Sequence, residues 1–219
     1  MSAAVLLTAG VALALLWAPE DADQGATQRI FYVHVPVALT AYAFFIWGAW
    51  KSLRLLWTGE ERRDLESYTA IHMGTIFGTL TLITGSLWAK TSWGIWWSWD
   101  ERQLVLFLVL FLFYAAYFML RFSLAEGPAR GRISAVYALF GVVLIPISFI
   151  AIRLLENLDP THPKAVLVTQ DGPKMAWEMF ATFVVCFAGM LVLGAALYKN
   201  ELLGKRLDAR LRELREALA

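Results

Sequence analysis

The sequence predicts an all-α membrane protein with six transmembrane helices, and three observations lead to that prediction. Of the 219 residues, 59% are hydrophobic and only 17% are charged, and the mean hydropathy is +0.57. This composition is hard to reconcile with a water-soluble surface. The apolar residues form runs close to the roughly 20 residues that a helix needs to cross about 30 Å of hydrocarbon. They do not alternate with polar residues, which argues against a transmembrane β-barrel.

Six runs are expected to span the membrane, and together they form one helical domain over residues 1–200. The first run is short and ends in small residues, as a secretory signal does, but it lacks a basic start and a convincing cleavage site, so we expect a retained helix. In the third run, the sequence GTIFG at 74–78 predicts close packing against another helix of the same chain rather than against a second copy. The runs are approximately 3–18, 33–57, 67–89, 104–122, 133–155 and 176–198.

The distribution of Lys and Arg predicts that both termini are cytoplasmic. This orientation places thirteen of the nineteen basic residues inside and six outside. The connection between the third and fourth helices then lies on the outer side. The inner set is Lys51, Arg54, Arg62, Arg63, Arg121, Arg130, Arg132, Lys199, Lys205, Arg206, Arg210, Arg212 and Arg215, and the outer set is Arg29, Lys90, Arg102, Arg153, Lys164 and Lys174.

The last residues, 201–219, are expected to form a cytoplasmic amphipathic helix. Leucines recur there at helical spacing among charged residues, which is typical of a basic helix on the lipids of the inner leaflet. A docking site for a partner protein is the alternative. The leucines are Leu202, Leu203, Leu207, Leu211, Leu214 and Leu218.

Several functions are excluded or unsupported by the sequence. No GxxxxGK[ST] motif is present, so the chain cannot drive transport with ATP by itself. The single cysteine, Cys186, permits no disulfide within the chain and is expected to be a small buried hydrophobe, and no CxxCH or CxxC motif exists. The net charge of +1 gives no indication of a nucleic acid partner.

The stretch WGIWWSWDERQ, at 93–103, concentrates tryptophans beside fixed charge. A belt at the membrane interface would explain one or two of them, and Ser98 with Glu101 fits a capping box that starts the fourth helix. The density instead predicts an aromatic platform for a large, flat, apolar ligand, with Arg102 available to its carboxylates. If the loop were helical, three of the indoles would share one face. The platform is Trp93, Trp96, Trp97 and Trp99, with Trp88 just upstream.

Two of the three histidines fall in outer connections on this topology. His34 opens the second helix in RIFYVHVPVA, with Pro36 in the first turn, and His162 lies between the last two helices in LDPTHPK. A lone interfacial histidine is usually solvated or capping, but two beside an aromatic platform suggest axial ligation of an iron porphyrin. His72, near the inner start of the third helix, is expected to have a hydrogen-bonded packing role.

The combination of WGIWWSWDER and RIFYVHVP resembles the WWD-domain membrane proteins that handle haem in cytochrome c maturation, most closely the haem exporter protein C family (CcmC). The resemblance covers nearly the whole chain, including the tryptophan-rich outer loop at 88–103. It implies a protein of the bacterial inner membrane that binds haem b transiently at its outer face and delivers it to the haem chaperone CcmE. It also implies the ATP-binding-cassette subunits CcmA and CcmB and the single-helix CcmD as partners, and haem transfer rather than enzymatic catalysis.

Carried over by position, the resemblance implies that His34 is the first axial ligand and that Arg102 occupies the family's basic position. Arg29, shortly before the histidine, could pair with a haem propionate. The platform implied by the resemblance is Trp88, Trp93, Trp96, Trp97, Trp99 and Asp100.

The second ligand fits the family pattern less directly. The family's W-W-x-x-L-H falls here on leucines in place of the aromatic pair and on Asp159 in place of the histidine, and His162 comes three residues later. We expect His162 to be the second axial ligand. Two other functions stay open: a haem lyase of the same superfamily, although those chains are typically much longer, and a permease or scaffold whose tryptophan loop is only an interfacial belt.

Overall fold

The computed structural model describes residues 2–21, 24–155 and 175–218. The predicted all-α fold is confirmed, and within these described residues five helices are long and apolar enough to cross a membrane. The helix nearest the N-terminus is apolar but has only 14 residues, about 21 Å at 1.5 Å per residue. The elements are α1 (Ala3–Leu16), the 3-10 helix η1 (Ala26–Ile30), α2 (Phe31–Thr58), α3 (Arg62–Trp93), α4 (Arg102–Ser123), α5 (Pro128–Leu155) and α6 (Trp177–Leu218).

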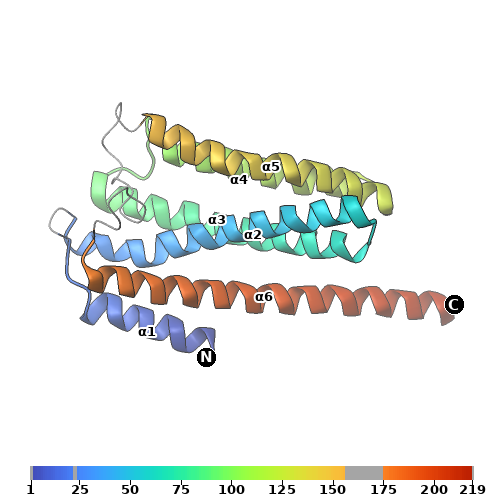
Figure 1. Cartoon of the computed structure of the whole chain (residues 1–219), viewed down its shortest axis with the longest axis horizontal. Helices are drawn as coiled ribbons and strands as arrows, with labels where there is room; N and C mark the ends of the chain where they lie inside the picture. The colour runs from blue at the N-terminus through green and yellow to red at the C-terminus, as the bar shows by residue number, and fades with distance from the viewer. Residues whose placement is uncertain (1, 22–23, 156–174, 219) are drawn as a thin grey trace.

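The helices lie side by side in one bundle, with α2 and α3 in the middle, α4 and α5 on one side and α6 and α1 on the other (Figure 1). The connection from α1 to α2 and the loop from α3 to α4 meet at one end, which we call the tryptophan end. The short loops α2–α3 and α4–α5 and the end of α6 lie at the other, which we call the C-terminal end. The described loops are therefore grouped at the two ends as the predicted order of the helices requires (Figure 1).

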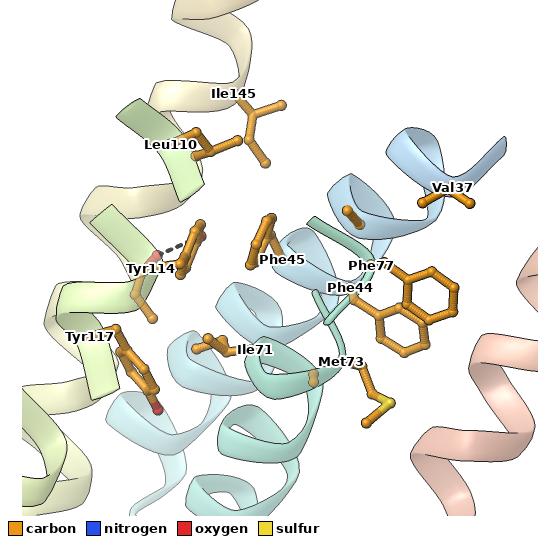
Figure 2. Close-up of a cluster of buried hydrophobic side chains, with 13 residues drawn as sticks. Val37, Phe44, Phe45, Ile71, Met73, Phe77, Leu110, Tyr114, Tyr117 and Ile145 are labelled. Carbon is orange, nitrogen blue, oxygen red and sulfur yellow. Dashed lines mark hydrogen bonds between the residues drawn. The ribbon is translucent and has the colours of Figure 1, made fainter. Parts of the chain in front are cut away.

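Close packing of aromatic rings and glycines holds the middle of the bundle together. Phe45 of α2 stacks on Tyr114 of α4 with ring centroids 3.9 Å apart, and the Tyr114 hydroxyl donates to the carbonyl of Ala138 at 3.4 Å (Figure 2). A Cβ at Gly74 would lie 2.6 Å from Cδ1 of Phe45, so only glycine allows α3 to approach α2 this closely. The GTIFG motif thus packs within the chain, as predicted.

Two helix starts differ from the predictions. α2 begins at Phe31, directly after η1, so Pro36 lies inside the helix rather than in its first turn. The proline ring removes one intrahelical hydrogen bond there, and the Thr40 hydroxyl donates to the Pro36 carbonyl at 2.8 Å. The predicted capping box is wrong: α4 begins at Arg102, its N-cap is Glu101, and no side chain caps it.

α6 runs without interruption for 42 residues, about 63 Å, and extends past the other helices (Figure 1). The predicted boundary near residue 200 is therefore not marked by a break in the helix. Arg206 pairs with Glu66 of α3 at 3.1 Å, which ties the first part of the extension to the bundle. Near its other end, α6 contacts α1, and Cys186 is buried there against Gly10, as predicted.

Candidate functional site

His34, the predicted first axial ligand, lies at the tryptophan end of the bundle (Figure 1). It lies in the first turns of α2 and is partly buried. Its Nδ1 is 2.9 Å from Oγ1 of Thr84 on α3, and a Cβ at Gly85 would lie 3.0 Å from its Cε1. The imidazole is thus packed against the third of α3 nearest the tryptophan end, where it contacts the Thr84 hydroxyl and the backbone of Gly85.

Trp88 lies one turn beyond Thr84 on the same side of α3, since residues four apart share a helix face. Its indole meets Trp93 edge to face, with centroids 4.9 Å apart and planes at 80°. Its Nε1 donates to Oε1 of Gln24 at 3.3 Å, which links α3 to the connection between α1 and α2. His34, Trp88 and Trp93 therefore belong to one region built by α2, α3 and that connection.

The rest of the tryptophan loop is not helical, so the shared face expected for a helical loop is not formed. Gly94, with φ of 77°, ends α3, and the ammonium group of Lys90 donates to its carbonyl at 2.8 Å. The same ammonium lies 5.8 Å from the ring centre of Trp96. Trp97 and Trp99 form a second edge-to-face pair, with centroids 5.7 Å apart.

This second pair lines a shallow groove of about 290 Å³, with Leu82 and Ser86 of α3 and Leu108 of α4. At 100° per residue, Leu82 and Ser86 lie on the side of α3 opposite Thr84 and Trp88. Among the described residues, the tryptophans thus form two edge-to-face pairs about the end of α3, one beside His34 and one in the groove.

The predicted polar residues of this end have few partners. Arg29 pairs with Glu20 at 3.4 Å, but its buried Nε has no hydrogen-bond partner within the described ranges. Arg102 and Asp100 make no hydrogen bond or ion pair with any residue that the structure describes. Guanidinium groups with unused donors suit the carboxylates of a ligand.

The remaining predicted residues are elsewhere. His162 and Asp159 lie outside the described residues. His72 lies near the C-terminal end, about 18 Å along α3 from Thr84, and its Nδ1 is 2.8 Å from Oε1 of Glu201, so its predicted hydrogen-bonded packing role is confirmed.

Sequence reasoning missed the residues that support the site. No sequence motif marks Thr84, Gly85 or Gln24. A threonine and a glycine within an apolar helix predict helix packing in general, not a particular contact. Trp17, at the end of α1, and Trp177, at the start of α6, were also missed; their rings meet edge to face at 5.9 Å and add aromatic surface to the tryptophan end.

Comparison with known proteins identifies the family. The family model "Heme exporter protein C" matches residues 1–216. The chain is 33% identical over 208 residues to the heme exporter protein C of Paracoccus denitrificans, covering 94% of this chain and 84% of that protein. The corresponding protein of Rhodobacter capsulatus is 32% identical over 224 residues, with 99% and 90% covered. That of Escherichia coli K12 is 30% identical over 200 residues, with 90% and 78% covered. These matches, which extend over nearly all of the sequence, show that the chain belongs to the haem exporter protein C family.

Proposed function

We propose that this chain binds haem at its tryptophan end and delivers it to the haem chaperone CcmE during cytochrome c maturation. Membership of a haem-handling family supports the cargo, and one structural observation supports the place. The His34 imidazole is held against α3, one turn from the Trp88–Trp93 pair and at the same end of the bundle as the tryptophan loop.

The residues at this end match the chemical parts of haem. Imidazole is a common axial ligand of haem iron, and His34 supplies it. Indole faces and the apolar groove suit the methyl and vinyl edges of the porphyrin, because burial of large apolar surfaces and contact with aromatic rings contribute several kcal/mol. Arg29 and Arg102 have donors for the propionates.

Delivery requires that the haem be held without a covalent bond to this chain. In the proposed mechanism, His34 and His162 ligate the iron on its two faces, and the tryptophans hold the ring. The vinyl edge stays accessible to the chaperone, whose own histidine takes over the haem. Asp100 has no partner in the described part of the chain, so its carboxylate can accept hydrogen bonds from the tryptophan loop or from the chaperone.

The proposal also includes the orientation of the chain in the membrane and its partner proteins. The larger number of basic residues at the C-terminal end supports placing that end in the cytoplasm, and the haem site then faces the periplasm. The ATP-binding-cassette subunits CcmA and CcmB and the small CcmD would assemble with the chain in the inner membrane. Residues 201–219 would lie on the cytoplasmic side.

An absorption spectrum of the protein purified from haem-replete membranes tests haem binding. We expect a Soret band in the wild type, its loss in His34→Ala, a weaker band in His162→Ala, and an unchanged band in His72→Ala, whose histidine lies near the other end. A wild type that stays colourless when hemin is added would favour the permease or scaffold function instead.

A transfer experiment tests delivery separately: the haem-loaded protein is mixed with CcmE, CcmE is pulled down, and its haem content is measured. We expect haem to move from the loaded wild-type protein to CcmE, and not from loaded protein to an apocytochrome alone. Direct attachment to the apocytochrome without CcmE would favour the haem lyase function.

A further inference from the structure

The hydrogen bond between His34 and Thr84 has a direction that the local geometry of α3 favours. The Thr84 hydroxyl carries one proton, and its oxygen lies 2.8 Å from the carbonyl of Leu80 and 3.3 Å from that of Thr81. Both carbonyls can only accept, so they favour a hydroxyl proton that points into the helix. The same oxygen is 2.9 Å from Nδ1 of His34, and in that arrangement it accepts a hydrogen bond from the Nδ1 proton. The neutral imidazole of this tautomer has its lone pair on Nε2.

Gly85 supports the same ring from the next position on α3. A Cβ there would lie 3.0 Å from Cε1 of His34, 3.6 Å from Nδ1 and 3.8 Å from Nε2. The first distance is shorter than ordinary van der Waals contact, so alanine would push the ring away. Thr84 and Gly85 thus support the imidazole together. The Thr84 hydroxyl accepts a hydrogen bond from it, and the missing side chain of Gly85 lets the ring approach the helix.

We propose that Thr84 and Gly85 are positioning residues for haem ligation by His34, and this inference rests on the proposed function. Thr84 selects the tautomer whose Nε2 can bind iron, and its hydrogen bond makes the imidazole a stronger electron donor, as such bonds do for other metal-bound histidines. Gly85 sets the distance of the ring from α3. Neither residue touches the haem in this role.

The first experiment compares hemin affinity and reduction potential among variants of the full-length protein. Thr84→Val keeps the shape of the side chain and removes the acceptor, and we expect it to weaken ferric haem binding about tenfold or more, within the range known for such partners of metal ligands. We also expect its reduction potential to rise, because a weaker donor stabilises ferric iron less. Thr84→Ser should restore both values, and Gly85→Ala should weaken binding even though the acceptor remains.

Thr79→Val is the matched control. Thr79 is exposed on the same helix, and its hydroxyl donates to the carbonyl of Thr75 at 3.0 Å. We expect wild-type affinity and potential. If Thr84→Val also has wild-type values while His34→Ala loses haem, the inference is wrong and the proposed function stands. If neither the wild type nor any variant binds hemin, the proposed function itself fails.

A second experiment does not depend on how well Thr84→Val folds. In His34→Gly, added imidazole can occupy the place of the side chain and donate to Thr84, whereas 1-methylimidazole has no N–H to donate when its other nitrogen binds iron. We expect imidazole to restore the haem spectrum better than 1-methylimidazole, and Thr84→Ala in the same background to reduce that preference. Equal restoration by the two compounds with Thr84 present would overturn the inference.

Discussion

The two ends of the bundle differ in how many of their charged side chains pair with one another. At the C-terminal end, Glu66 is buried and accepts from Lys51 at 2.9 Å, Arg63 at 3.0 Å and Arg206 at 3.1 Å. These contacts join α2, α3 and the extension of α6. A second group lies nearby, in which the Glu201 carboxylate contacts both the His72 imidazole and the Lys205 ammonium group.

At the tryptophan end, three of the polar groups lack such partners. Arg102, Asp100 and the indole nitrogen of Trp97 have no hydrogen-bond or charged partner among the residues the structure describes. Trp96 and Trp99 are 57% and 73% exposed. Buried or half-buried polar groups are normally paired in native proteins. The C-terminal end therefore pairs Glu66, Asp64 and Glu201 within the chain, although the Nε atoms of Arg54 and Arg130 have no partner among the described residues, and the tryptophan end has donors and apolar surface that a ligand can use.

The largest expected effect concerns stability at the C-terminal end. The Asp64 carboxylate accepts two hydrogen bonds from Arg121, at 2.8 and 2.6 Å, and the Arg121 side chain is only 5% exposed. Asp64→Asn leaves this guanidinium without a counter-charge, and we expect a loss of about 3–5 kcal/mol in the free energy of unfolding. Thermal unfolding in detergent measures it, while the hemin affinity of the folded fraction should stay at the wild-type value.

The double substitution Asp64→Leu with Arg121→Met is the control for this prediction. It removes both charges together, so we expect it to recover most of the lost stability. A selective loss of haem affinity in Asp64→Asn, with stability unchanged, would contradict the division of the two ends into a structural end and a ligand end.

The sequence predicted the helices and the placement of the tryptophan loop at one end of the bundle, because the signals for both are strong. Apolar runs separated by short charged loops specify the helices, and the tryptophan motif marks one end. Boundaries were less accurate: α2 extends back to Phe31, and Glu101 rather than Ser98 precedes the first residue of α4. A local capping pattern did not decide where α4 begins.

The internal geometry of the site could not be read from the sequence. Three of the tryptophans would have shared a face in a helical loop, but the loop after Gly94 is not helical, and the Trp97–Trp99 pair lies in the groove instead. The contact of His34 with Thr84 joins residues 50 positions apart, and it depends on how α2 and α3 pack rather than on any motif. The role of His162 stays a prediction.

A smaller effect is expected at Trp88. Phenylalanine there would keep an aromatic ring but lose the hydrogen bond to Gln24 and part of the contact with Trp93. Aromatic contacts of this kind contribute about 0.5–1.5 kcal/mol, so we expect hemin affinity to fall several-fold, as measured by titration. Trp57→Phe is the matched control, because Trp57 is 70% exposed at the other end of α2. An equal loss in both variants would indicate a general interfacial belt rather than a site.

The smallest effect is expected at Arg102, where stability and hemin affinity should not fall together. Arg102 is the first residue of α4, where a positive charge is unfavourable beside the positive end of the helix dipole. Helix stability therefore does not explain an arginine at this position, and a carboxylate ligand does. We expect Arg102→Gln to leave the free energy of unfolding unchanged or slightly higher, and to lower hemin affinity by the equivalent of about 0.2–1 kcal/mol. Haem dimethyl ester has no propionate charge, so the wild type and the variant should bind it equally. A loss of the same size with the ester would mean that Arg102 acts through the shape of the loop rather than by pairing with haem.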